Sequence, residues 1–210
     1  MRFESSKQLY SYWLGLKGTR KAPDRCEIEP SDIRSHLGDT FILEVNHEQK
    51  HITYRLAGTR LCSAFGKEVR GMGYLVPWQE EDNFKVLQAI SGVYSDYTPC
   101  VISHLGLTEQ RRFMEYETLL LPLLPVNDGT SRIFGISSPK KEAFWIGAEP
   151  IVNHTLRSIR PVVQSRENSG DKNLILSPPM QYEDFLDEST PAPQGTRKFG
   201  HLVVHDGGKS

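Results

Sequence analysis

The sequence predicts an α+β fold, a five-stranded antiparallel sheet with helices on one face, a leading N-terminal helix and a largely irregular C-terminal tail. The strand signal is clearest at residues 52–57, where Ile52, Tyr54 and Leu56 alternate with less apolar neighbours, the period of a half-buried strand. The helix signal is clearest directly after it, where Thr59 is a suitable N-cap and apolar residues follow at helical spacing until a glycine. A longer helical pattern comes next, and further strand patterns follow it. This order of strands and helices is typical of an α+β fold.

The leading helix is expected within the first 18 residues. Ser5 or Ser6 can cap it, and Gly15 or Gly18 can end it. Its apolar residues fall at helical spacing: Leu9, Tyr12, Trp13 and Leu16. Such a helix must bury its tryptophan, either on the open face of the sheet or on a second protomer. A second, short helix is expected at residues 30–37, which Gly38 would end.

The five strands are expected in two groups on either side of a long helix. They lie at residues 40–45, 52–57, 100–107, 112–121 and 132–137. The helix at residues 80–94 carries one apolar stripe, formed by Phe84, Leu87, Ile90 or Ser91, and Tyr94. The run at residues 119–124 is apolar on both faces of its strand, so the sheet needs cover on both sides. That cover is either the leading helix or a second copy of the chain.

The chain divides into three parts. Residues 1–38 hold the leading helices, residues 39–153 form the sheet domain, and residues 154–210 form a proline-containing tail without sustained periodicity. The tail ends in a strand-like segment at residues 199–205, which could pair with an exposed sheet edge of this or another protomer.

Composition indicates a cytoplasmic protein. With 210 residues, 38% of them hydrophobic, and a net charge of −1, the chain has enough apolar content for one core and no broad attraction to nucleic acid or anionic lipid. The three cysteines are far apart and lack a Cys-x-x-Cys pair, as expected of reduced thiols. We find neither a signal-peptide pattern nor a run of the ~20 apolar residues that span a membrane. We therefore expect no nucleic-acid or membrane partner.

Several short motifs are distributed along the sheet domain and the segment before it. They are Trp13-Leu14 with Gly18, Arg20, Pro23 and Arg25; residues 54–60 (Tyr-Arg-Leu-Ala-Gly-Thr-Arg); Phe65-Gly66 with Glu68, Arg70 and Gly71; Trp78; and residues 117–122. Together these motifs resemble one proteobacterial subfamily of PAS-domain proteins, formerly catalogued as a domain of unknown function. The resemblance spans roughly residues 5–152, and the ending at 200–208 is also similar. It implies a PAS-like sheet, and it implies links to cell-cycle, motility or second-messenger signalling.

A ligand pocket in such a fold would lie between the sheet and the helices that follow the second strand. The candidate lining residues are Arg60, Leu61, Phe65, Trp78, Leu87, Cys100 or Ile102, His104 and Tyr116. Arg60 could hold an anion through its planar guanidinium, and His104 could donate a hydrogen bond or bind haem. A filled apolar core is the alternative for the same residues. No cofactor is required by the sequence, and none is identified.

One catalytic-looking motif is expected to be inert. Residues 47–51 match the His-Glu-x-x-His pattern of zinc peptidases, in which both histidines lie on one helical face. Here the pattern falls between two strand-like segments, so we expect a polar hairpin loop and no metal site.

The sequence therefore favours a non-catalytic regulatory protein that acts through protein contacts and forms a homodimer. The alternative is a sensor that holds a small metabolite in the pocket. An enzyme is the weaker alternative, because no nucleophile, base and orienting group occur together in a credible context.

Overall fold

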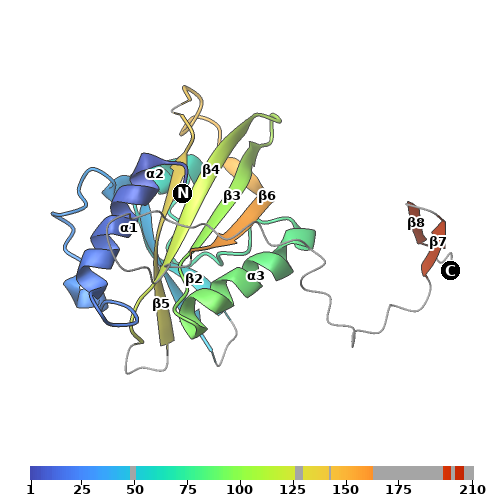
Figure 1. Ribbon diagram of the computed structural model, residues 1–210. Coiled ribbons are helices and arrows are strands. Elements are labelled where there is room, and N and C mark those ends of the chain that lie inside the picture. Colours follow the sequence, from blue (N-terminus) through green and yellow to red (C-terminus); the bar gives the residue numbers. More distant parts are fainter. Residues whose placement is uncertain (48–50, 126–129, 142, 163–195, 200–201, 206–210) are drawn as a thin grey trace. The chain divides into compact units, whose positions relative to one another are not determined.

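The computed structural model describes residues 1–47, 51–125, 130–141 and 143–162, together with the backbone of 196–199 and 202–205. Its centre is a six-stranded antiparallel sheet in the order β2-β1-β5-β4-β3-β6 (Figure 1). The strands are β1 (Thr40–Asn46), β2 (His51–Ala57), β3 (Cys100–Thr108), β4 (Phe113–Pro122), β5 (Thr130–Pro139) and β6 (Ile151–Pro161). The α-helices are α1 (Glu4–Lys17), α2 (Thr59–Phe65) and α3 (Glu80–Ser95), and two 3₁₀ turns are η1 (Arg25–Glu27) and η2 (Leu37–Asp39). The predicted α+β class is confirmed.

Strand β6 is an addition to the five predicted strands. It pairs with β3 along most of its length, and the predicted domain boundary at residues 153 and 154 falls inside it. The pairing register shifts between Ser103 and His104, which leaves Arg157 as an extra residue in β6. Because this bulge breaks the period-two alternation, His154 and Ile159 both lie in the apolar side of the sheet although they are five residues apart. The sequence pattern therefore looks irregular.

The sheet is covered on both faces, as the apolar run at residues 119–124 predicts. Leu120 packs in one core cluster with α2 and α3, whereas Leu119 and Leu121 pack in a second cluster with α1. All three leucines are fully buried. Figure 1 shows α1 lying across β4 and β5. The leading helix thus packs on the open face of its own sheet, which is one of the two alternatives given above.

The first turn of α1 is held by the sheet, and the expected serine cap is wrong. The helix begins after Phe3, and the Glu117 carboxylate of β4 accepts hydrogen bonds from the backbone N–H groups of Arg2 at 2.8 Å and Phe3 at 3.1 Å. Ser5 instead donates to the Ser138 hydroxyl of β5 at 2.8 Å. A carboxylate beside a helix N-terminus also interacts favourably with the helix dipole. Tertiary contacts therefore supply the cap that the local sequence does not.

Two other local predictions are also corrected. Residues 30–37 form turns followed by η2 in place of an α-helix. Thr59 is the first residue of α2, and the N-cap is Gly58, whose backbone is extended. A Cβ at position 58 would lie 2.2 Å from the carbonyl oxygen of Leu37, so only glycine allows these two turns to approach so closely.

The predicted buried stripe of α3 is partly wrong. Val86, Ile90 and Val93 are fully buried, whereas Phe84 is 62% and Leu87 42% exposed. The helix carries two apolar stripes, and its own pattern does not choose between them. Its first turn is fixed by Asp82, whose carboxylate accepts a hydrogen bond from the Leu156 backbone N–H at 2.8 Å. This contact with β6 helps set which stripe faces the sheet.

The strand-like C-terminal segment forms a hairpin with the residues before it. The backbones of β7 (Thr196–Phe199) and β8 (Leu202–His205) pair with each other in an antiparallel two-stranded sheet. The residues at 200 and 201 lie outside the described part of the chain.

Two tryptophans predicted to be buried are confirmed as core residues. Trp13 is 1% and Trp78 5% exposed, and the Trp13 indole N–H donates to the Pro122 carbonyl at 2.9 Å.

We predict that Trp13→Ala and Trp78→Ala each lower the free energy of unfolding by about 3–5 kcal/mol, because each removes a large buried side chain. Urea titrations followed by circular dichroism measure the change. Trp13→Phe should cost less than Trp13→Ala, since it keeps most of the apolar contact and loses one hydrogen bond worth about 1 kcal/mol. Wild-type tryptophan fluorescence typical of solvent-exposed indoles would contradict this prediction.

Candidate functional site

The candidate site is a small cavity between the sheet, α2 and the segment that leads into α3. Its lining is dominated by aromatic and imidazole rings, with two hydroxyl groups at one side. The lining residues are Phe41, Tyr54, Leu61, Ala64, Phe65, Tyr74, Trp78, His104, Tyr116, Thr118, Ser137, Ile151 and His154. No charged side chain is present among these described residues.

Five of the residues named from the sequence meet at this cavity: Leu61, Phe65, Trp78, His104 and Tyr116. Ile102 belongs to the adjoining core cluster but does not line the cavity. Leu87 lies on the exposed side of α3, and Cys100 is buried in the same core cluster as Ile102. The structure therefore brings most of the apolar candidates together and leaves Leu87 outside.

Arg60 does not reach the cavity. It lies at the start of α2 and forms a forked ion pair with Asp39, with Nε 2.9 Å and Nη2 2.6 Å from the two carboxylate oxygens. Its Nη2 also donates to the Ser35 carbonyl at 3.2 Å. The arginine thus ties α2 to the turn before β1, on the outside of the domain.

His154 is the main cavity residue that sequence reasoning missed. It lies on β6, opposite Gly106 of β3, and its ring centroid is 4.5 Å from that of His104 and 5.2 Å from that of Trp78. Strand β6 was not recognised from the sequence, so nothing indicated that this histidine faces inward. The spacing of His154 and Leu156, two residues apart on one side of a strand, is the one local signal.

Burial lowers the pKa of both histidines. The pKa of His154 falls to about 4 because its ring is desolvated, although a hydrogen bond to the Leu105 backbone acts in the opposite direction. The pKa of His104 lies well below its ordinary value, first because of burial and second because of the neighbouring His154. Both rings are therefore neutral at pH 7.

A row of hydrogen bonds leads from the cavity across three strands. The Nε2 atom of His104 lies 3.0 Å from the Thr118 hydroxyl, which donates to the Ser137 hydroxyl at 2.9 Å. These polar side chains come from β3, β4 and β5, so they join the centre of the sheet on its cavity side.

Four buried polar atoms around the cavity have no hydrogen-bond partner within the described residues: Trp78 Nε1, His104 Nδ1, His154 Nδ1 and the Tyr116 hydroxyl. An unpaired buried polar group costs about 1–3 kcal/mol, so such groups usually face water or a ligand. The indole N–H is a donor only, and it therefore requires an acceptor. The water-accessible volume is about 10 Å³, close to the space of one water molecule.

The His-Glu-x-x-His pattern lies at the β1–β2 hairpin. His47 follows β1 and His51 begins β2, where it pairs with Asn46, while residues 48–50 lie outside the described part of the chain. The Nε2 atom of His47 is 2.9 Å from the Ser131 hydroxyl. Within the described residues, no cluster of three or more histidine, cysteine or acidic side chains could hold a metal ion. That the pattern is inert stays a prediction.

We predict that the protein loses stability as the pH falls from about 6.5 toward 4. In the unfolded chain both cavity histidines take up a proton near pH 6.5, whereas the folded state, with its lowered pKa values, does not. Each histidine lowers the free energy of unfolding by at most about 1.4 kcal/mol per pH unit within this window. His154→Gln should flatten the dependence measured by urea titration at several pH values, and His51→Gln, at an exposed position, should not. Equal pH dependence in the wild type and His154→Gln would contradict the assignment.

Comparison with known families assigns residues 1–138 to a family. A family model described as a PAS domain matches residues 1–138, from the N-terminus through most of β5. No curated protein matches the chain in a sequence comparison. No helix among the described residues is long and apolar enough to cross a membrane. Because the match covers well over half of the 210 residues and agrees with the sheet and helix order above, the chain belongs to the PAS-domain family.

Proposed function

We propose that this PAS protein is a non-catalytic, cytoplasmic regulator that acts through protein contacts in bacterial signalling that controls the cell cycle, motility or a second messenger. Membership in the PAS family indicates a sensory or signalling role. The observation that favours protein contacts is that the core cavity is small, whereas the concave surface outside the core is large. The core cavity has room for about one water molecule, whereas an open depression of about 510 Å³ lies on the outer face of the sheet.

This open depression lies beside the first turn of α1, on the part of the sheet that α1 leaves uncovered. Its lining includes Arg2, Phe3, Ser103, Leu105, Phe113, Glu115, Glu117 and Arg157. Phe113, at the start of β4, is 64% exposed although it is a large apolar side chain. An exposed aromatic residue in a depression with a polar rim is typical of an interaction surface.

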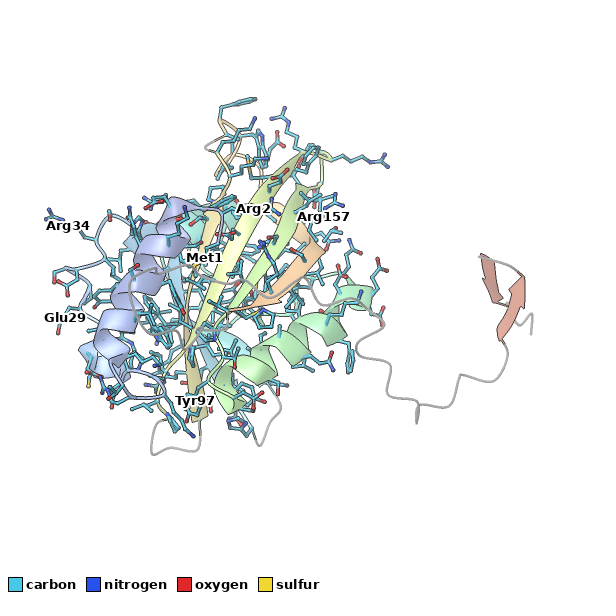
Figure 2. All side chains as sticks on the ribbon, in the orientation of Figure 1. Met1, Arg2, Glu29, Arg34, Tyr97 and Arg157 are labelled. Atoms are coloured by element: carbon cyan, nitrogen blue, oxygen red, sulfur yellow. The ribbon has the colours of Figure 1, made fainter. Side chains whose placement is uncertain are left out.

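The proposed partners are a second copy of the chain and a protein of the signalling pathway. The rim carries both signs of charge, from Arg2 and Arg157 and from Glu115 (Figure 2 labels the two arginines). A two-fold interface uses the same patch twice, so a patch with both charges and a central aromatic residue can complement itself. In this proposal the interface includes the residues before the first turn of α1 together with the sheet, because Arg2 and Phe3 line the same depression.

We predict that the 210-residue chain is a dimer in solution and that Phe113→Asp converts it to a monomer, because a buried unpaired carboxylate would disfavour the interface. Light scattering coupled to size-exclusion chromatography measures the mass. Phe144→Asp is the matched control, since Phe144 is 91% exposed but does not line the depression. A wild-type monomer would exclude the homodimer, and a dimer in both variants would move the interface elsewhere.

The second candidate function is a sensor of a small uncharged molecule in the core cavity. The four unpaired polar atoms favour it, because a ligand with both an acceptor and a donor would satisfy them. The cavity has no charged lining among the described residues, and both histidines are neutral, so a charged ligand would be poorly stabilised there. A ligand larger than one water molecule would need the surrounding rings to move apart.

We predict that native mass spectrometry of freshly purified protein gives the mass of the chain without a bound metabolite if protein contacts alone carry the function. An additional mass that is lost on unfolding, and is also lost in Trp78→Phe, would instead support the sensor. Trp145→Phe is the control, because Trp145 is also buried but does not line the cavity.

A further inference from the structure

A second concave surface lies outside the core, between the turns that precede β1 and the start of α2. It is a groove of about 560 Å³, within the range of about 300–1,000 Å³ of small-molecule sites. It is separate from both the histidine cavity and the open depression beside α1, apart from Phe41, which the groove shares with the cavity. Neither the proposed regulatory function nor the PAS family match assigns a role to it.

The floor of the groove is apolar and consists of side chains that belong to the core. Ile28, Ile33, Ile42 and Phe134 line it and are each at most 5% exposed, so their positions are set by the core around α1. Apolar side chains also stand at its open side, where Leu37 is 42% and Leu56 46% exposed. Exposed leucines beside a buried apolar floor leave apolar surface that an acyl or similar chain could cover.

The polar side of the groove is lined by positive side chains, one of which, Arg60, is compensated by its ion pair with Asp39. Three arginines, Arg25, Arg34 and Arg60, line it, and no carboxylate does among the described residues. Arg25 is half-buried, and Arg34 lies at the outer rim with its side chain extended toward solvent (Figure 2). Neither of these two side chains forms a hydrogen bond or an ion pair with a described residue. A guanidinium group binds carboxylates well because of its planar fork of donors.

The third arginine gives the groove a fixed wall. Arg60 is held by its forked ion pair with Asp39 and by the Ser35 carbonyl, so it joins the two segments that form the groove. Its side chain lies 3.1 Å from the position that a Cβ on Gly38 would take, and Gly58 packs directly on the Leu37 carbonyl. The approach at Gly58 requires glycine, whereas a Cβ at position 38 would require the Arg60 side chain to shift by a few tenths of an ångström. The contacts between the turns before β1 and the start of α2 therefore fix the width of the groove.

We propose that this groove binds a small amphipathic carboxylate, with its apolar chain along the isoleucine and leucine side chains and its carboxylate at Arg25 and Arg34. The positive rim distinguishes it from the core cavity, whose uncharged lining and neutral histidines disfavour an anion. Apolar burial supplies affinity for the chain, and the two rim arginines supply the preference for a carboxylate over an uncharged head group.

Isothermal titration of the 210-residue chain with octanoate tests this proposal. Octanol, which has the same chain without the charge, and acetate, which has the charge without the chain, serve as ligand controls. We expect saturable binding of octanoate and at least tenfold weaker binding of both controls. Absence of saturable octanoate binding, or equal affinity for octanol, would overturn the proposal.

Charge variants locate the binding. The double variant Arg25→Gln/Arg34→Gln should weaken octanoate binding about three- to tenfold, as expected for the loss of two exposed ionic contacts. Arg70→Gln/Arg111→Gln makes the same change in net charge at exposed positions outside the groove and should bind within twofold of the wild type. Equal weakening in both double variants would show a general charge effect and overturn the site, and loss of binding in His154→Gln would move the ligand to the core cavity. Circular dichroism melting curves confirm that each variant is folded.

Discussion

The structure depends on one strand, β4, being apolar on both faces. Leu119 and Leu121 require a cover on one side of the sheet, and Leu120 requires a cover on the other. The chain meets the first requirement with α1 and the second with α2 and α3, so the helices that precede and follow the first hairpin are both needed to hide the same strand. Because α1 is narrower than the sheet, it covers β4 and β5 but leaves the outer part of β3, β4 and β6 open. The open depression is a direct result of that mismatch.

The same two central strands also join the core cavity to the leading helix. Thr118 and Ser137 face the cavity and continue the hydrogen-bond row from His104. Their chain neighbours Glu117 and Ser138 face the other way and hold the first turn of α1. Successive residues of a strand point to opposite faces, so the paired Thr118 and Ser137 face the cavity and the adjacent pair, Glu117 and Ser138, faces α1. The seating of α1 and the hydrogen bonding of the cavity are therefore supported by adjacent backbone positions.

The concave surfaces of the domain differ in charge, and this difference separates their chemistry. The core cavity is aromatic and uncharged, with histidines that burial keeps neutral. The groove before β1 combines buried isoleucines with arginines, and the depression beside α1 carries both signs of charge around Phe113. An uncharged molecule, an amphipathic anion and a protein surface would each be accommodated best at a different one of these places. The groove and the depression have no lining residue in common, whereas the cavity and the depression share His104 and Tyr116. Under the proposed function, the groove is therefore the site that does not overlap the interaction surface.

The amino-acid sequence was sufficient to predict the helices and strands whose patterns lie within one short segment. The hairpin follows from the alternation at residues 52–57, and the leading helix follows from the spacing of Leu9 and Trp13. The cover on both faces of the sheet follows from the apolar run at residues 119–124. Each of these depends on the order of apolar residues along a short segment. The PAS-like fold that the resemblance implies placed Leu61, Phe65, Trp78, His104 and Tyr116 in one predicted pocket, and all five line the cavity.

The remaining features depend on contacts with residues that are distant in sequence, so they became visible only in the tertiary structure. The bulge at Arg157 hides the strand β6, so the inward position of His154 cannot be read from the local pattern. The buried stripe of α3 was ambiguous because two apolar stripes compete, and the contact of Asp82 with β6 is made across 74 residues of chain. Arg60 was expected in the cavity as a group that could hold an anion. Successive helical residues point in different directions, however, and Asp39 holds the Arg60 side chain outside. Local periodicity predicts which residues share a face. The element that packs against that face depends on contacts between residues that are far apart in the sequence.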